Sequence, residues 1–338
     1  MTKPAVHLVV GPPDHGVVIF ADWLARQTGG HRIHLPGPEA FDASVLARIR
    51  ELGAPVHLQY TEALFGPHTT TAAAGFVRLR SALPGPVGVT LHDLPDPADE
   101  PGRYQRRSAG YREVARAADV VCVSSRHELR LLNQLAPEVT SAQVIPLPMA
   151  ADPVVEPADR PRPRPEVAVF GFIYPGKGHA AVLGEMRDLP EGIALTAIGR
   201  LADNHADLGS ELTDAAARSG RSFAVTGFLP EAELQTRLRL SAVPVVPATN
   251  ISASGSLNTW IAAGRRPLVA EGPYTRELAE DCPGLLTLYR PGEFAEAARE
   301  VLADASKSWL LQTPPPERHE SAVAEAYLNV FAPAGVSS

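Results

Sequence analysis

Short apolar runs alternate with longer segments of helical periodicity along the whole chain. The runs are continuous rather than alternating, which is typical of parallel strands covered on both faces. In the first half, we expect strands at Ala5–Val10, Pro55–Tyr60, Val87–Leu91, Asp119–Val123 and Gln143–Leu147. The segments around them predict helices at Gly16–Gln27, Asp42–Leu52, His68–Leu83, Arg103–Ala118 and Arg126–Leu135. This alternation indicates βαβ units that build one parallel sheet.

The second half of the chain repeats the same alternation. Its predicted strands are Glu166–Phe170, Ala194–Ile198, Ser222–Thr226, Val243–Val246, Pro267–Ala270 and Leu285–Leu288. Its predicted helices are Gly178–Met186, His205–Arg218, Glu231–Ser241, Gly255–Ala263, Tyr274–Glu280 and Glu293–Ala303. We therefore expect an α/β protein with two doubly wound, Rossmann-like domains and ligands in the cleft outside the carboxyl ends of their strands.

A proline-rich segment, Pro146–Pro165, separates the two halves and is too poor in packing residues to belong to a core. We place the N-terminal domain at 1–148 and the C-terminal domain at 149–312. The remaining segment, 313–338, is expected to hold a helix at Glu317–Phe331 and to end in a disordered tail after Ala332.

Composition excludes several classes of function. The chain has 338 residues and a formal net charge of −7, so nucleic acid is not an expected partner. No apolar run approaches the roughly 18 residues that cross a bilayer, and the first apolar stretch is too short for a signal peptide, so we expect a cytoplasmic protein without stable membrane insertion. The two cysteines, Cys122 and Cys282, have no partners at metal-ligand spacing. We expect no metal site.

Lysine usage singles out one loop. Only three lysines occur, at Lys3, Lys177 and Lys307, among 31 basic residues. A chain that uses arginine for most positive charges has placed one lysine inside a glycine-rich loop, Gly171–Gly178, directly after a predicted strand. A compact ammonium on a slim stem suits a phosphate group there. The loop is not a P-loop, because it lacks the spacing G-x-x-x-x-G-K-[ST].

Other loops after predicted strands carry residues suited to ligand binding. Gly11–Gly16 precedes a helix and offers backbone N–H groups to an anion, although an ordinary tight turn explains it equally well. His92, followed by Asp93, comes directly after the third predicted strand and is a candidate for polar contacts near neutral pH. Ser125 and Glu128 form a capping box, so their expected role is structural.

In the second half, two further loops lead into helices. Thr226–Leu229 offers backbone contacts to a flat base, and Ser254–Ser256 begins a helix whose unpaired N–H groups suit phosphate oxygens. Plain N-capping is the alternative for the serines. Together with Lys177, this helix start predicts a clamp for a diphosphate.

The order of these motifs resembles retaining glycosyltransferases of family 4. The resemblance rests on His92-Asp93, on V-S-S at 123–125, on V-I-P at 144–146, and on three longer runs. These are F-G-x-x-x-P-x-K-G at 170–178, T-G-F-L-P-x-x-E-L at 226–234 and A-x-G-R-x-P-L-V at 262–269. It implies the GT-B fold, a nucleotide-diphosphate sugar as donor substrate, retention of anomeric configuration, and no cofactor or metal.

Carried over to this sequence, the resemblance assigns roles to single residues. His92 would lie beside the transferred sugar and Lys177 would neutralise the leaving diphosphate, so both are the expected catalytic residues. The expected donor-binding residues are Gly16, Gly171, Thr226, Gly227, Phe228, Leu229, Ser254, Gly255, Ser256, Asn258 and Thr259. The resemblance also implies that the last helix crosses back to the N-terminal domain.

The sequence departs from the family pattern at two places. Many members carry two glutamates in E-x7-E, and the matching positions here are Ile251 and Thr259. Asn258 or Thr259 would then have to bind the ribose. The family's basic residue shortly before the lysine is also absent, since the run 172–174 is Phe-Ile-Tyr. The diphosphate clamp therefore depends more heavily on Lys177.

We expect a hexosyltransferase that acts on a hydroxyl of a small soluble acceptor. The acceptor is expected near Gly11–Gly16, Thr61–His68 and Arg103–Arg107, where the arginines either bind an anionic group or form a solvated helix face. Two rivals stay open: a nucleotide-sugar epimerase, and a non-catalytic nucleotide-sugar-binding subunit that supports a partner enzyme. A homodimer is also left open.

Overall fold

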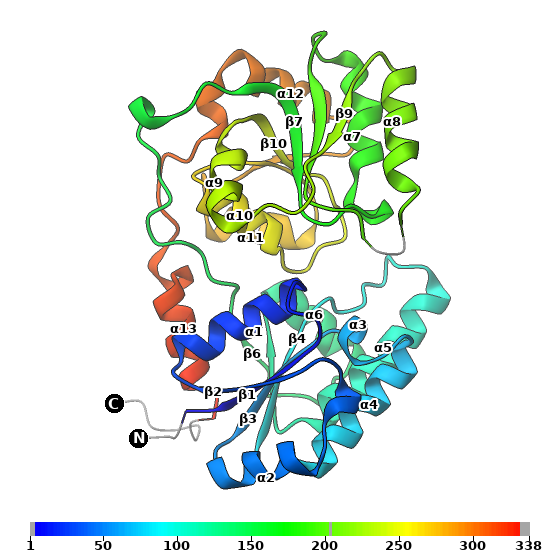
Figure 1. Ribbon diagram of the computed structural model, residues 1–338, viewed down its shortest axis with the longest axis vertical. Coiled ribbons are helices and arrows are strands. Elements are labelled where there is room, and N and C mark those ends of the chain that lie inside the picture. Colours follow the sequence, from blue (N-terminus) through cyan, green and yellow to red (C-terminus); the bar gives the residue numbers. More distant parts are fainter. Residues whose placement is uncertain (1–3, 203–204, 332–338) are drawn as a thin grey trace. The chain divides into compact units, whose positions relative to one another are not determined.

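The computed structural model describes residues 4–202 and 205–331, and within them the chain divides into two compact units (Figure 1). The first unit contains the chain up to Leu147 and the segment from Glu320 on, and the second contains Pro148–His319. Each unit is built on a six-stranded sheet. The tail predicted to be disordered lies outside the described residues.

The sheet of the first unit is parallel throughout, in the order β2-β1-β3-β4-β5-β6. Its strands are β1 (Val6–Val10), β2 (His31–Leu35), β3 (Val56–Tyr60), β4 (Val87–Leu91), β5 (Val120–Val123) and β6 (Gln143–Val144). Its helices are α1 (Gly16–Gln27), α2 (Ala43–Leu52), α3 (Glu62–Phe65), α4 (Thr69–Ala82), α5 (Pro101–Ala117), α6 (Arg126–Leu135) and α13 (Glu320–Leu328). The strands β1 and β3 are neighbours. The chain continues from β1 to β2 on one side and from β3 to β4 on the other, so the order of strands reverses between them.

The second sheet is also parallel, in the order β12-β11-β10-β7-β8-β9. Its strands are β7 (Arg164–Phe170), β8 (Ala194–Ile198), β9 (Phe223–Val225), β10 (Ser241–Val246), β11 (Leu268–Ala270) and β12 (Thr287–Tyr289). Its helices are α7 (His179–Glu185), α8 (Leu208–Arg218), α9 (Glu231–Arg239), α10 (Gly255–Ala262), α11 (Pro273–Asp281) and α12 (Phe294–Ala303). Short 3₁₀ helices occur at Pro38–Ala40, Pro157–Asp159, Pro175–Lys177, Met186–Asp188, Ala305–Ser308 and Pro316–Arg318.

The strand β2 was missed by the sequence analysis. Its sequence His-Arg-Ile-His-Leu is mostly polar, and only Ile33 and Leu35 are buried, because β2 is the edge strand of the first sheet. An edge strand needs few apolar side chains, so its pattern was too weak to detect. The short helix α3 was also missed.

Both sheets are covered on two faces, which explains their continuous apolar strands. In β7, Val167 and Val169 belong to one core and Ala168 belongs to another. In β5, Val121 and Val123 pack on one side, whereas Cys122 joins a cluster with α1 and α13. The alternation of side chains along each strand therefore supplies two hydrophobic layers per sheet.

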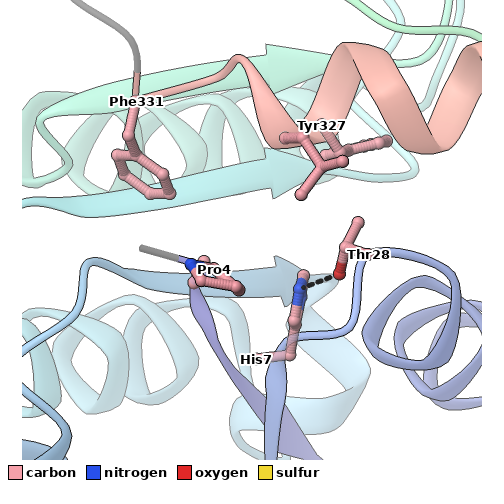
Figure 2. A pocket seen from close by; sticks show the side chains of 7 residues that line it. Pro4, His7, Thr28, Tyr327 and Phe331 are labelled. Carbon is pink, nitrogen blue, oxygen red and sulfur yellow. Dashed lines mark hydrogen bonds between the residues drawn. The ribbon is translucent and has the colours of Figure 1, made fainter. Parts of the chain in front are cut away.

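Helix α13 packs on the first unit through aromatic and polar contacts. Tyr327 lies 5.3 Å from the His57 ring, and its hydroxyl is 3.1 Å from Thr90 Oγ1. Figure 2 shows Tyr327 and Phe331 at a small pocket shared with His7, whose Nε2 bonds Thr28 Oγ1 at 2.9 Å. Helix α13 and Val330 are therefore part of the first unit's core.

None of the described helices is both long enough and apolar enough to cross a bilayer.

Candidate functional site

The loops after β7 and β10 begin the candidate site in the second unit. These strands are neighbours in the sheet, yet the chain continues from β7 toward β8 and from β10 toward β11, on opposite sides. At such a switch point the two loops leave the carboxyl edge of the parallel sheet in opposite directions, and ligands of open α/β folds bind there. The loop after β7 contains Lys177, and the loop after β10 leads into α10.

Glycines hold the Lys177 loop against its neighbours. Gly171 has φ +118°, and a Cβ on Gly199 would overlap the carbonyl oxygen of Gly171, so the loops after β7 and β8 touch through bare backbone. Gly178, at φ +92°, packs on Pro247, the first residue after β10. Side chains at these positions would separate the loops. The predicted glycine-rich loop is therefore fixed on both sides.

Lys177 and Ser256 meet across the switch point. Lys177 Nζ donates a hydrogen bond to Ser256 Oγ at 3.1 Å, and Ser256 Oγ lies 3.2 Å from Ser254 Oγ. Ser254 is the N-cap of α10, and its hydroxyl accepts from Leu257 N–H at 3.2 Å. Lys177 thus lies at the positive end of α10, where nothing in the helix compensates its charge.

The Lys177 ammonium has no carboxylate partner among the described residues. Burial lowers its pKa to about 8, because desolvation penalises the charged form. Gly171 leaves space for the Lys177 ammonium because it has no side chain: a Cβ there would lie 3.0 Å from Lys177 Nζ. A partly desolvated cation without a counterion, next to a helix N-terminus, is an arrangement that an anionic ligand would stabilise.

The predicted ribose contacts are occupied by bonds within the unit. Asn258 Nδ2 donates to the carbonyl of Pro148 at 3.0 Å, and Thr259 Oγ1 donates to the carbonyl of Gly255 at 2.9 Å. Asn258 Oδ1 is buried without a hydrogen-bond partner among the described residues. Neither side chain resembles a glutamate in reach or charge.

The loop after β9 is held to the loop after β8. Thr226 Oγ1 accepts from Gly199 N–H at 3.1 Å and donates to the carbonyl of Gly227 at 2.8 Å. Leu229 packs against the core, whereas the Phe228 side chain is 74% exposed. An exposed aromatic ring beside a backbone loop offers a stacking surface for a flat ligand.

In the first unit, His92 is fixed by a partner that the sequence did not indicate. His92 Nε2 lies 2.7 Å from Gln59 Oε1, and Gln59 Nε2 lies 3.4 Å from His57 Nδ1. Since Gln59 Oε1 accepts, Nε2 of His92 carries the proton and Nδ1 keeps a lone pair. Burial lowers the pKa of His92 to about 4, with Asp93 opposing and His15 assisting the shift. The imidazole is therefore neutral near pH 7.

The loop that follows His92 has a strained backbone conformation that neighbouring side chains hold in place. Asp93 has φ +54°, and it is the one non-glycine residue with positive φ in the described chain. Thr61 Oγ1 donates to Asp93 Oδ2 at 3.2 Å, and Tyr111 donates from its hydroxyl to the carbonyl of His92 at 2.7 Å. Packing and hydrogen bonds thus hold the loop in a conformation that costs energy.

Gly16 begins α1 and is exposed, and a Cβ would meet nothing within 4 Å. The N-cap is His15, whose Nδ1 accepts from Val17 N–H at 3.2 Å. Burial lowers the pKa of His15, and Asp93 and Asp14 oppose this shift. Any contact of Gly16 with a ligand would come from its backbone.

Arg107 was expected either at an anionic ligand or on a solvated face, and it does neither. Its side chain is buried, with ion pairs to Glu62 at 2.7 Å and Asp99 at 3.2 Å. It also donates to the carbonyl of Asp93. The guanidinium therefore supports the strained loop from inside the unit, which spacing along the sequence could not reveal.

We expect Arg107→Ala to lower the free energy of unfolding of the first unit by about 2 kcal/mol, because three charge-assisted acceptors lose their donor. Chemical denaturation would measure the change. Arg103→Ala, at an exposed position on the same helix, is the control and should have no effect. An equal loss of unfolding free energy in both variants would contradict the role of Arg107 in holding the loop after His92.

An open cavity of about 630 Å³ lies at the switch point between β1 and β3. Its lining comes from the loops after β1, β2 and β3 and from α4. The residues include Pro12, Pro38, Phe41, Leu64, Phe65 and Pro67. Two charged side chains, Glu39 and Arg78, also line it. This volume suits a small ligand with an apolar body and a few polar groups.

No cluster of three or more His, Cys, Asp or Glu side chains able to hold a metal occurs in the described part of the chain.

No protein-family model and no curated protein matches the chain. Solved structures match over nearly its whole length. Anabaena HepE in complex with UDP-glucose is 14% identical with a TM-score of 0.69, over 97% of this chain and 95% of that one. Sucrose-phosphate synthase from Thermosynechococcus elongatus is 15% identical with a TM-score of 0.67, over 97% and 94%.

A third structure is AviGT4, a glycosyltransferase involved in avilamycin A biosynthesis. It is 16% identical, with a TM-score of 0.59 over 97% of both chains. These similarities, together with the two parallel sheets, confirm the predicted GT-B fold with two Rossmann-like domains.

Proposed function

We propose that the chain is a glycosyltransferase that moves a hexosyl group from a nucleotide-diphosphate sugar to a hydroxyl of a small soluble acceptor, with retention and without a metal. One observation carries the proposal. Lys177 presents an ammonium with no carboxylate partner among the described residues, bonded at 3.1 Å to Ser256 at the start of α10, at the switch point of a GT-B fold. The complementary ligand is a diphosphate.

The remaining donor contacts follow from the surrounding loops. In this proposal, the N–H groups of Ser254, Gly255 and Ser256 bind phosphate oxygens, and Thr226–Leu229 bind the base, with Phe228 as a stacking surface. The family resemblance assigns His92 and the backbone of Gly16, both in the first unit, to contacts with the transferred sugar. The lone pair on His92 Nδ1 would accept a hydrogen bond from a sugar hydroxyl.

The proposed reaction breaks the bond between the anomeric carbon and the diphosphate oxygen, and the electron pair leaves with the diphosphate. The acceptor oxygen bonds to the anomeric carbon on the same face, and its proton passes to an oxygen of the leaving diphosphate. Negative charge grows on the diphosphate as the bond breaks. Lys177 and the α10 N-terminus stabilise that charge, so their contribution is larger in the transition state than in the ground state.

For the acceptor, we propose the cavity at the switch point of the first sheet. Its prolines and aromatic rings suit an apolar body, and Arg78 and Glu39 offer charged contacts at its lining. Of the three segments where the acceptor is expected from the sequence, Gly11–Gly16 and Thr61–His68 contribute to this lining and Arg103–Arg107 does not.

Titration with a panel of nucleotides and nucleotide sugars tests the proposal. UDP-glucose is the first donor to try, because HepE was crystallised with it. We expect a nucleoside diphosphate to bind and raise the melting temperature, and its sugar donor to be hydrolysed slowly or transferred to an added acceptor pool. Failure of every nucleoside diphosphate to bind would overturn the proposal.

A second candidate, a non-catalytic nucleotide-sugar-binding subunit, has one observation in its favour. Ile251 and Thr259 stand where the family carries glutamates, and the Thr259 hydroxyl is engaged with the carbonyl of Gly255. This candidate predicts donor binding without hydrolysis and without transfer to any acceptor. The same experiment therefore separates the two candidates.

A further inference from the structure

A row of buried polar side chains crosses the face of the first sheet on which α13 packs. His57 and Gln59 are two residues apart on β3, so their side chains point to the same face. Thr90 on β4 is paired in register with Gln59, and His92 follows the end of β4. None of these four side chains is more than 6% exposed. Buried polar groups of this kind need one another as hydrogen-bond partners, so the positions of their protons are linked.

The Gln59 amide joins two imidazoles and couples their protons. Its Oε1 lies 2.7 Å from His92 Nε2, and its Nε2 lies 3.4 Å from His57 Nδ1. An amide oxygen only accepts and an amide nitrogen only donates, so Nε2 of His92 carries a proton and Nδ1 of His57 does not. His57 Nε2 then carries the other proton and lies 3.3 Å from Thr90 Oγ1, which lies 3.1 Å from the Tyr327 hydroxyl. The row therefore runs from His92 to α13.

The partner of His92 is neutral, which limits what the imidazole can do. A carboxylate at this place would stabilise an imidazolium, whereas an amide orients the ring without adding charge. Asp93, on the same loop, raises the pKa of His92, and His15, at the start of α1, lowers it, but burial has the largest effect. His57, at the other end of the amide, has its own pKa lowered by burial and by its two neighbouring imidazoles. The ring of His92 therefore stays neutral near pH 7.

The second nitrogen of His92 is left for a ligand. The described residues supply no hydrogen-bond partner for Nδ1, and this atom is not among the fully buried ones. A neutral ring with its proton on Nε2 has a lone pair on Nδ1, so it can accept a hydrogen bond there and cannot donate one.

We propose that Gln59 is a positioning residue that holds His92 as a neutral hydrogen-bond acceptor for the transferred sugar, rather than as an acid or a base. The inference rests on the proposed function, in which a sugar hydroxyl donates to His92 Nδ1 and the acceptor proton passes to the leaving diphosphate. His57 holds the far end of the amide, so Gln59 cannot rotate without unpairing both imidazoles.

NMR of the chain with isotope-labelled histidine tests this role without any substrate. The two ring nitrogens of His92 give signals that identify its tautomer and its charge, and His92→Gln identifies which signals belong to it. For the wild type, we expect a proton on Nε2 alone and a ring that stays neutral between pH 7 and pH 5. Gln59→Met, which keeps the length but removes the amide, should give a mixture of both tautomers. Gln59→Glu should raise the pKa of His92 by roughly 1–3 pH units, because a carboxylate would then lie beside Nε2–H.

Turnover connects the state of His92 with the reaction. Gln59→Met should lower kcat/KM for transfer or donor hydrolysis by about tenfold, the size of one net hydrogen bond. Its affinity for a nucleoside diphosphate should not change, because the proposed phosphate contacts all belong to the second unit. Gln59→Glu, compared with the wild type at each pH, should keep most of kcat/KM at pH 8 and lose it as pH falls through the raised pKa of His92. Gln134→Met, at an exposed position on α6, is the control.

The outcomes separate failure of the inference from failure of the proposed function. A proton on His92 Nδ1 in the wild type, or unchanged His92 signals in both Gln59 variants, would overturn the inference. So would equal losses of kcat/KM in Gln59→Met and Gln59→Glu at pH 8, because Gln59 would then only fill space. Absence of turnover in the wild type, with the expected nitrogen signals, would refute the proposed function and leave the inferred state of His92 standing. Melting curves exclude unfolding, and either variant serves if the other does not fold.

Discussion

Lys177→Ala is expected to lower turnover by roughly 30- to 1,000-fold, the equivalent of about 2–4 kcal/mol of transition-state stabilisation. Among the described residues, the Lys177 ammonium is the one charged group that hydrogen-bonds the start of α10, so its loss removes a positive charge that no other side chain bonded there supplies. Donor hydrolysis or transfer, measured under single-turnover conditions, reports the change.

The same substitution should leave the fold unchanged or make it slightly more stable. A partly desolvated cation without a carboxylate partner costs folding energy, so its removal is expected to leave the melting temperature equal or higher. A structural lysine would show the opposite sign. Lys177→Arg should not restore turnover, because the wider guanidinium would have to fit over Gly171, where a Cβ alone would lie 3.0 Å from Nζ.

Lys307→Ala is the matched control. Lys307 is exposed and pairs with Glu300 at 2.8 Å on the surface, so its loss should change neither turnover nor stability appreciably. The pH profile adds a further check. Because the pKa of Lys177 is lowered to about 8, kcat/KM should fall as pH rises through that value. If Lys177→Ala keeps wild-type turnover, the proposed catalytic role of Lys177 is wrong.

Lys177 also shows how far the sequence alone could go. Its position in a glycine-rich loop after an apolar run, in a chain with three lysines, was enough to select it. The strands β4 and β8 and the helices α1 and α6 were predicted with the bounds that the structure has, because each combines a clear apolar pattern with a clear start or end signal. The edge strand β2 lacks that pattern and was missed.

The meeting of Lys177 with Ser256 was predicted, but the partners of other site residues were not, since they come from distant parts of the chain. Gln59 and His92 are brought together by parallel pairing of β3 and β4. Arg107 was expected at an anionic ligand or on a solvated helix face, but it is buried and forms ion pairs with Glu62 and Asp99. Register and burial decide such contacts, and neither can be read from spacing.

Acidification from pH 7 to pH 5 is expected to destabilise the first unit by about 4 kcal/mol through His7 and His92, and His57 acts in the same direction. Burial lowers the pKa of His7 and of His92 to about 4 and that of His57 well below its ordinary value. The folded state therefore binds fewer protons than the unfolded state once the pH falls below about 6.5. Stability is fully present above that pH and is lost as pH falls toward 4, with about 2 kcal/mol lost by pH 5 for each of His7 and His92.

Helix α13 should be released first. His57 contacts Tyr327 and Phe331 and bonds Thr90, which in turn bonds the Tyr327 hydroxyl, so a charge on this imidazole would lie directly under the helix. The neighbouring groups are the imidazoles of His7 and His92, which oppose protonation, and no carboxylate is among the causes that shift the pKa of His57. Hydrogen exchange, converted to opening free energies, would resolve α13 and β1 from the second unit.

His7→Gln separates this mechanism from general acid instability. Figure 2 shows the hydrogen bond between His7 Nε2 and Thr28 Oγ1. Because the Thr28 hydroxyl donates to the carbonyl of Leu24, it accepts from His7, and a glutamine amide can still donate to it but does not titrate. The variant should therefore lose about 2 kcal/mol less than the wild type between pH 7 and pH 5. His31→Gln, on the exposed start of β2, is the control and should follow the wild type. His179 in the second unit also has its pKa lowered to about 4, so only a readout confined to the first unit isolates His7. Parallel pH dependences of β1 opening in the wild type and in His7→Gln would show that proton uptake at His7 does not drive the change.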